Sequence, residues 1–419
     1  MVKSYKWYDA LQYAVLWLTI AAIVVNWRAG LWMTLLLALV TVAKVVAQRR
    51  LGNPALGRAL RWVLAGPIAY WLVLALSMAW TSDLPTGMEV LRLKSVMLVV
   101  PLCILLSDTS YMHENHLRGL GYALLSALCA AFFYFAVKAG MAMRQGMSLG
   151  EFQNAFYGSR EAGEVYHHAY IALYAVVAMV FVYSELSSHW KTMRPWHRCL
   201  LIVSLLLLIC YVVVVNSRAG MLAMGLAMLA CVAHFAVTRR SWKLGLGIAA
   251  LAVVGIVAAT QLVPGYSDRI SSTLENVEAD ARTSINRCNW HACVKSPLSG
   301  YGVGDYHAVQ VAQYTEDGFD YGAKAGFNAH NQYMESLLAA GIPGLAGLLF
   351  FLLAPLTAAL RRGRRRFLVA ILVVVVAFNL LFESMLERQM GLQFISMVYG
   401  IMVLIMSVEE NKFARSAKS

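Results

Sequence analysis

Charged residues are scarce in this sequence. Asp, Glu, Lys and Arg make up only 14% of its 419 residues, whereas soluble proteins contain about 25%. Mostly apolar stretches of about 18 residues or more, long enough to cross the hydrocarbon core of a bilayer, recur from end to end. This composition excludes an ordinary soluble protein and predicts an all-α polytopic membrane protein.

Cysteine is also scarce, and no spacing of Cys with His resembles a zinc site. Cys288 and Cys293 lie in a long polar segment, where oxidation is chemically possible. They occupy positions i and i+5 of a predicted helix, which points the two thiols in different directions. This geometry disfavours a disulfide between them.

Acidic residues are outnumbered, with 22 Asp and Glu against 35 Lys and Arg and a net charge of +13. The basic excess gathers in the loops of one side, as the positive-inside rule expects of cytoplasmic loops. The longest polar segment is mildly acidic, whereas a nucleic-acid binder would be basic there. The charge distribution therefore argues against nucleic acid as a partner and predicts that both termini are cytoplasmic.

Twelve apolar stretches predict about twelve transmembrane helices. Their approximate bounds are residues 9–27, 30–48, 62–80, 88–107, 119–138, 166–186, 199–216, 219–237, 243–263, 333–359, 367–383 and 390–407. The large polar segment between the ninth and tenth helices should face the periplasm or the exterior. The expected organisation is nine helices with short loops (1–263), a helical periplasmic loop domain (264–332), three helices (333–408) and a cytoplasmic tail (409–419).

The polar segment carries the most distinctive motifs. They are Arg287-x-x-Trp290, Pro297-x-x-Gly300-x-Gly302-x-Gly304, and His330-Asn331 followed after nine residues by Gly341-x-x-Gly344. The first three glycines follow a predicted helix rather than a strand, so they predict a turn beside a ligand or a span and not a dinucleotide site. Gly341 predicts a break in the next helix, because a helix from about Ala329 to Leu360 is too long for a simple crossing.

Local signals also place helices within this segment. Ser272–Glu275 predicts a capping box, and Ser284–Lys295 predicts a second helix. Asn328 is the predicted N-cap of the helix that carries His330 in its first turn. The positive end of the helix dipole would then disfavour the imidazolium. A neutral imidazole at the membrane surface suits a general base.

A second site centres on Arg218, in a short exterior turn between two apolar stretches. An arginine left in lipid costs several kcal/mol, so this one should face a polar cavity or an anion. With Arg287 and His330 on the same side, it suits a phosphate group on a lipid, because guanidinium groups match phosphate oxygens. Weaker candidates for substrate binding are Arg92, Lys94, Arg160, His168 and Asn331.

Plainer interpretations of these cations stay open. Arg218 alone also fits an interface residue whose charged end reaches water. Arg287 also fits an ion pair with Asp280 or Glu278.

These motifs resemble the bacterial O-antigen ligases and the wider superfamily of O-antigen polymerases and O-linking protein oligosaccharyltransferases. The resemblance covers the twelve-span layout and the loop before the tenth span. It is carried by Ser217-Arg218-Ala219-Gly220, by Arg287-x-x-Trp290 with Pro297, Gly300 and Gly302, and by His330-Asn331-x9-Gly341-x-x-Gly344.

The resemblance implies a C-type glycosyltransferase fold in the bacterial inner membrane, with a periplasmic active site. The implied reaction moves O-antigen glycan from undecaprenyl diphosphate to a sugar hydroxyl of lipid A–core, with inversion and without a metal or other cofactor. By position, His330 corresponds to the essential histidine of the family, and Arg218 and Arg287 correspond to its two essential arginines.

Two other classes of function remain open. O-antigen polymerases and O-linking protein oligosaccharyltransferases share the donor and the chemistry but differ in the acceptor. A secondary transporter is the third class, since many carriers have twelve spans with both ends inside. A carrier should show two matching halves, however, and this sequence has its one large loop after the ninth predicted span.

Overall fold

The structure is a computed structural model that describes residues 6–158, 167–239, 278–361 and 366–416. All regular structure within these ranges is helical. Three predictions lie outside the described residues, namely the ninth span at 243–263, the capping box at Ser272–Glu275 and the candidate Arg160.

The helices follow one another along the chain with few long connections. They are α1 (Lys6–Val25), α2 (Trp27–Gln48), α3 (Arg58–Leu76), the 3-10 helix η1 (Ser77–Trp80), α4 (Leu84–Lys94), α5 (Val96–Leu106), α6 (Glu114–Arg144), α7 (Leu149–Gly158), α9 (His168–His189), α10 (Pro195–Val215), α11 (Arg218–Arg239), α14 (Glu278–Lys295), α15 (Tyr306–Glu316), α16 (Asp320–Ala325), α17 (Gln332–Arg361), α18 (Arg366–Asn379), the 3-10 helix η2 (Met385–Glu387) and α19 (Gln389–Ser416).

Nine of the described helices are long and apolar enough to cross a membrane. Two shorter apolar helices, Val96–Leu106 and Phe367–Asn379, fall on further predicted spans. The prediction of an all-α polytopic membrane protein is therefore confirmed. The number twelve stays a prediction, because one predicted span is not described and these two helices are shorter than a full crossing.

The predicted span at 88–107 is wrong in its boundaries. The chain forms two helices there, since α4 ends at Lys94 and α5 begins at Val96. The intervening Ser95 turns its hydroxyl back onto the carbonyl of Arg92, 2.6 Å away. Cations in the last turn of α4 favour an end at this point, because the carboxyl end of a helix is electronegative.

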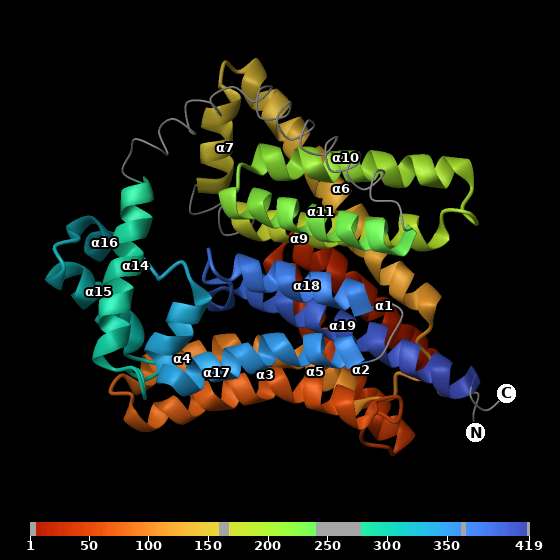
Figure 1. The fold of residues 1–419 in the computed structure, drawn as a ribbon, viewed down its shortest axis with the longest axis horizontal. Helices are drawn as coiled ribbons and strands as arrows, with labels where there is room; N and C mark the ends of the chain where they lie inside the picture. The colour runs from red at the N-terminus through yellow and green to blue at the C-terminus, as the bar shows by residue number, and fades with distance from the viewer. Residues whose placement is uncertain (1–5, 159–166, 240–277, 362–365, 417–419) are drawn as a thin grey trace.

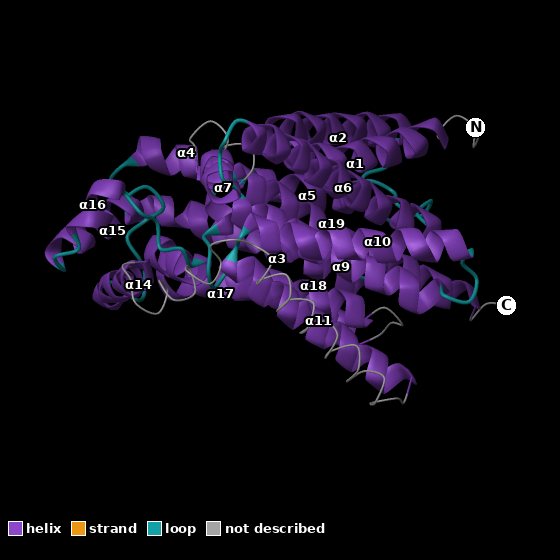
Figure 2. Cartoon of the chain, turned by 90° about the horizontal axis from the view of Figure 1, so that it is seen from above, coloured by secondary structure: helices purple, strands orange, loops and turns teal. Residues whose placement is uncertain are grey.

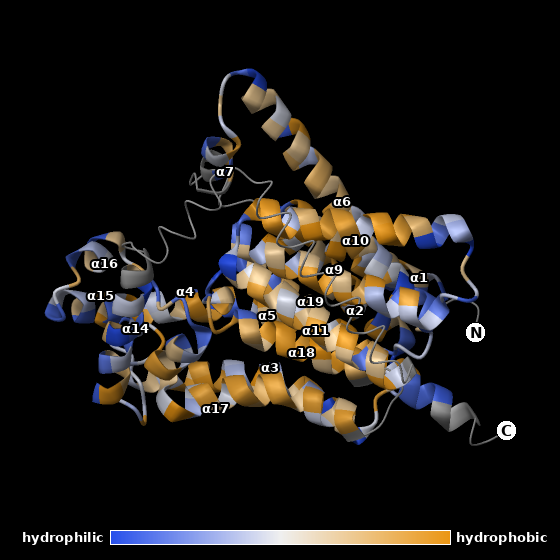
Figure 3. Ribbon diagram, turned by 45° about the horizontal axis from the view of Figure 1, so that its top comes forward, coloured by the Kyte–Doolittle hydropathy of each residue, from blue (hydrophilic) through white to orange (hydrophobic). Residues whose placement is uncertain are grey.

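The long helices run side by side, and the loop helices α14–α16 gather at one end of them (Figure 1). The start of α1 and the end of α19 lie at the opposite end, and a second view agrees (Figure 2). Hydropathy follows this division, since the long helices are mainly hydrophobic whereas α14–α16 contain many hydrophilic residues (Figure 3). The start of α1 and the end of α19 thus lie at the end of the bundle opposite α14–α16, and the cytoplasmic location of the termini stays a prediction.

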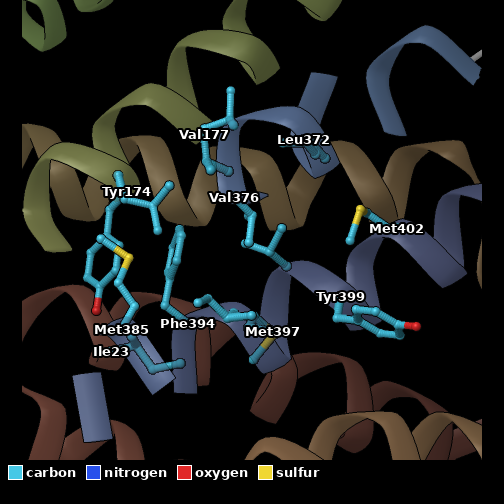
Figure 4. Close-up of a cluster of buried hydrophobic side chains, with 14 of the residues drawn as sticks. Ile23, Tyr174, Val177, Leu372, Val376, Met385, Phe394, Met397, Tyr399 and Met402 are labelled. Carbon is cyan, nitrogen blue, oxygen red and sulfur yellow. The ribbon is translucent and has the colours of Figure 1, made fainter. Parts of the chain in front are cut away.

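The two most enclosed candidate spans, α9 and α19, form the centre of the bundle. Their aromatic side chains stack directly, with the rings of Tyr174 and Phe394 centred 3.8 Å apart. Val177, Val376 and Met397 belong to the same buried cluster (Figure 4). This packing fixes the ends of α9 and α19 relative to each other, and those ends carry part of the candidate site.

The predicted break at Gly341 is confirmed. The backbone of α17 leaves helical geometry at Ala340 and Gly341, where Gly341 has φ 62° and ψ −154°. The carbonyl of Leu338, which the break exposes, accepts a hydrogen bond from the N–H of Tyr301 at 2.8 Å. The loop after α14 thereby takes over bonds that the interrupted helix cannot make.

The approach of these two backbones explains the glycines of the motif. A Cβ on Gly300 would lie 2.5 Å from the carbonyl oxygen of Leu338, and one on Gly341 would lie 2.3 Å from that of Leu298. Both glycines also have positive φ, a conformation that other residues adopt at a cost. The predicted turn beside a span is therefore confirmed, and the span is α17.

The loop helices form a small cluster of their own. The predicted helix 284–295 is confirmed as the main part of α14, whereas α15 and α16 were not expected. Ile285 and Cys288 of α14 pack against Tyr314 of α15. Cys288 and Cys293 are both free and buried, and burial raises the pKa of their thiols to about 11 and about 12.

Candidate active site

His330 lies just before α17, in left-handed backbone geometry with φ 45°. The predicted cap is corrected at this point. The side chain of Asn331, not Asn328, caps α17, since its Oδ1 accepts from the N–H groups of Tyr333 at 3.0 Å and Met334 at 3.2 Å. Asn328 instead accepts a hydrogen bond from the N–H of His330. Because His330 precedes the helix, the helix dipole does not account for its protonation state, and Asn331 uses its side-chain oxygen for capping.

The imidazole of His330 instead meets a buried carboxylate. Its Nδ1 lies 3.3 Å from Oε2 of Glu383, in the loop that joins α18 to η2. The side chain of His330 is 31% exposed, whereas that of Glu383 is only 7% exposed. The imidazole is therefore partly exposed, whereas its carboxylate partner is buried.

The charge of Glu383 decides which imidazole nitrogen carries a proton. Burial acts to raise the pKa of Glu383, but the hydrogen bond and the charge of His330 outweigh it, with smaller contributions from His167 and Arg388, and lower the pKa to about 2. Near neutral pH the group is a carboxylate, which can only accept hydrogen bonds. Nδ1 of His330 must therefore be the donor, and the lone pair of the neutral ring lies on Nε2.

Two further histidines border this pair. His168 begins α9, and its ring stacks on that of His167 with centroids 4.5 Å apart. Burial, helped by the neighbouring His168, lowers the pKa of His167 to about 3. His167 is thus neutral near pH 7 and adds a polar group without a charge. The candidate His168 lies beside the site, stacked on His167.

Arg218 is the first residue of α11, and the surrounding motif is a helix start. Ser217 caps this helix by accepting the N–H of Gly220 on its hydroxyl, 3.2 Å away. A Cβ on Gly220 would lie 2.3 Å from the side chain of Ala172 in α9. The serine and glycine thus fix α11 against α9, and the guanidinium of Arg218 is exposed at the positive end of the helix.

Arg287 is exposed on α14, at the same end of the bundle as the start of α11 (Figure 1). A chain of side chains ties α14 to the histidine loop. Asn289 donates to the hydroxyl of Tyr314 at 2.8 Å, and that hydroxyl reaches the carbonyl of Asn328 at 3.5 Å. The helix that carries Arg287 is therefore positioned relative to His330. Its suggested partners Glu278 and Asp280 have no described side chains.

The two cations of α4 differ in their surroundings. Arg92 is exposed and lies 3.7 Å from the equally exposed Glu89. Lys94 is only 2% exposed, pairs with Glu387 and donates to the carbonyl of Leu386 at 3.0 Å. Burial alone would lower the pKa of Lys94, but the charge of Glu387 raises it. Lys94 is therefore not accessible as a substrate ligand. Its contacts instead support the loop that contains Leu386 and Glu387.

The loop between α18 and α19 is what sequence reasoning missed. It supplies Glu383, Glu387 and Arg388, three charged residues in a short connection. Charged residues in so short a loop indicate a functional or structural role. Their spacing in the sequence, however, does not indicate which residues they contact. The described structure brings His330 together with Glu383, and His167 and the candidate His168 lie next to this pair. Arg218 and Arg287 stand on α11 and α14, at the same end of the bundle.

Comparison with known proteins covers the same region. Residues 203–349 match the family model described as O-antigen ligase. These residues, about a third of the chain, are therefore similar to the O-antigen ligase family. The matched residues include Arg218, Arg287 and His330. Similarity to this family implies a glycosyltransferase-type enzyme that uses lipid-linked glycans. None of the curated proteins compared with the chain matches it.

Proposed function

We propose that the protein is an O-antigen ligase, a metal-independent inverting glycosyltransferase of the inner membrane. It would transfer O-antigen glycan from undecaprenyl diphosphate to a sugar hydroxyl of lipid A–core on the periplasmic face. The observation that carries this proposal is the contact of His330 with the buried carboxylate of Glu383. This contact leaves a reachable imidazole nitrogen with a free lone pair, inside the end of the bundle that bears the family motifs.

The chemistry follows from that nitrogen. Nε2 of His330 takes the proton of the acceptor hydroxyl as its oxygen attacks the anomeric carbon of the donor sugar. The bond from that carbon to the diphosphate oxygen breaks, and undecaprenyl diphosphate leaves with the bonding electron pair. A single displacement of this kind inverts the anomeric centre. Glu383 stabilises the imidazolium that forms, because its charge is already oriented toward Nδ1.

The two arginines act on the leaving group. Negative charge grows on the diphosphate as the glycosidic bond breaks, and guanidinium groups hold phosphate oxygens at any working pH. Arg218 lies where the dipole of α11 adds to its own charge. Arg287 stands on a helix tied to the histidine loop. Both positions support the proposal that these arginines bind the donor diphosphate.

The acceptor separates this proposal from its relatives. A polymerase would extend the glycan on the lipid carrier, and a protein oligosaccharyltransferase would label a protein hydroxyl. The same base and the same arginines serve all three reactions, so only the product distinguishes them.

The test is transfer by purified protein in liposomes that contain polyprenyl-diphosphate glycan and lipid A–core, with chelator added. Wild type and the control His291→Ala, which alters an exposed histidine of α14, should form glycosylated lipid A–core. His330→Ala should form none. Product on the carrier or on a protein would assign the chain to a relative, and full activity of His330→Ala would remove this histidine from the mechanism.

A further inference from the structure

The peptide groups on both sides of His330 are bound to buried side chains. The N–H of Ala329 donates to Oε1 of Glu335 at 2.7 Å. The N–H of Asn331 donates to the hydroxyl of Ser384 at 3.2 Å, and that hydroxyl donates to the same oxygen of Glu335 at 3.1 Å. We call this closed set of three hydrogen bonds the Glu335–Ser384 clasp.

The clasp encloses a residue with an unusual backbone. His330 has φ 45°, in the left-handed region, which few residues other than glycine adopt. Such a conformation persists where the surrounding structure over-determines it, and it is common at functional sites. Here the hydrogen bonds on either side of His330 hold this conformation, since one reaches Oε1 of Glu335 directly and the other reaches it through Ser384.

The clasp and the partner of the imidazole come from consecutive residues. Glu383 contacts the ring of His330, while Ser384 bonds to the next peptide group of the histidine loop. One short loop therefore sets both the backbone and the ring of His330. A shift of Ser384 would move the carboxylate of Glu383 with it.

Neither clasp residue can touch a substrate. Glu335 is 1% exposed and Ser384 is fully buried. The second oxygen of Glu335 is also engaged, since it lies 3.3 Å from the side-chain nitrogen of Gln310 in α15. The described groups that donate hydrogen bonds to Glu335 are thus all neutral. This suits a carboxyl group that holds the loop in place better than one that transfers protons.

We propose that Glu335 and Ser384 are positioning residues that hold His330 in the geometry needed to accept the proton of the acceptor hydroxyl. This inference rests on the proposed role of His330 as the base. Supporting groups of this kind commonly change activity by about 10- to 100-fold when they are lost. Their loss should lower kcat and leave the KM for the donor unchanged, because the donor is bound by other residues.

The decisive experiment compares Ser384→Thr with Ser384→Val in the liposome transfer assay. The two replacements have the same branched shape, so any crowding in the buried site is shared, and only threonine retains the hydroxyl. We expect kcat of Ser384→Val to be at least about 10-fold below that of Ser384→Thr, with equal donor KM. Ser396→Ala, which removes an equally buried hydroxyl from α19, should retain wild-type kcat.

Glu335 is tested by a second matched pair. Glu335→Gln keeps a carbonyl oxygen that can accept both bonds, whereas Glu335→Leu has a similar size and no acceptor. We expect Glu335→Gln to retain more kcat than Glu335→Leu by about the same factor.

The outcomes separate the two proposals. Equal kcat for the threonine and valine variants of Ser384, alongside an inactive His330→Ala, would overturn the clasp and leave the base assignment intact. A change confined to donor KM would also overturn it. Full activity of His330→Ala would instead refute the proposed function on which the inference rests.

Discussion

The contact between His330 and Glu383 makes the sharpest prediction, for the variant Glu383→Gln. Glutamine keeps the size of the side chain but removes its charge. A hydrogen bond to a charged group contributes about 1.5–3 kcal/mol, and each 1.36 kcal/mol of barrier is a factor of ten in rate. We therefore expect kcat to fall about 10- to 150-fold. The loss would be larger if the amide N–H₂ turns toward Nδ1, because the ring proton would then move to Nε2 and block the base.

The measurement is steady-state transfer from polyprenyl-diphosphate glycan in liposomes, with kcat and donor KM determined separately. Glu316→Gln is the matched control, since Glu316 is an exposed carboxylate that pairs with Lys295 at 2.6 Å on the loop helices. Exposed pairs contribute little, so this variant should behave as wild type. A kcat of Glu383→Gln equal to that of wild type would refute the assignment of Nδ1 as the buried, oriented nitrogen.

Three further predictions concern stability. The folded-state pKa of Glu383, about 2, lies below its ordinary 4.5. Its contribution to the free energy of unfolding is therefore complete above pH 4.5 and is lost as the pH falls toward 2. The difference in Tm between wild type and Glu383→Gln should shrink across that window. Gly300→Ala places a Cβ against the carbonyl of Leu338 at positive φ and should cost about 1–3 kcal/mol. Lys94→Met leaves Glu387, whose side chain is only 13% exposed, without its cation and should cost about 3–5 kcal/mol. Thermal unfolding in detergent measures all three.

Two substitutions serve as controls for the glycine and lysine variants, because each makes the same type of change at an unconstrained position. Gly140→Ala in α6 meets open space and should leave Tm unchanged or slightly raised, because alanine is the better helix former. Arg92→Met removes an exposed cation from the same helix as Lys94 and should change stability by less than about 1 kcal/mol. Equal losses for Arg92→Met and Lys94→Met would contradict the supporting role of Lys94.

Helices were predictable from the sequence wherever a long apolar run decides the structure, as in α6 or α10. The predicted span at 88–107 was wrong at its N-terminal end, because the residues there belong to the separate, more polar helix α4 and only the following apolar run forms α5. Helices α15 and α16 were missed because they are short and lack an apolar period. They are held by the cluster around Tyr314, and such tertiary support leaves little local signal.

The motif residues of the site were visible in the sequence, but their partners were not. Glu383 follows His330 by 53 positions, and Glu387 follows Lys94 by 293. The first contact depends on the packing of α17 against α18, and the second on the packing of α4 against η2. The predicted cap at Asn328 failed for a related reason, since either asparagine suits a helix start and the loop bonds of Ser384 select the second.

The position of these partners divides the proposed chemistry between two parts of the chain. The O-antigen ligase domain at residues 203–349 supplies the arginines and the histidine itself. The loop between α18 and α19 lies beyond it and supplies Glu383, which sets the protonated nitrogen of that histidine. In the proposed mechanism, the residues that stabilise the leaving group lie within the matched residues, whereas the activation of the acceptor hydroxyl also depends on a loop outside them. A motif search alone cannot distinguish a chain with an oriented base from one without it, because the deciding carboxylate belongs to no motif.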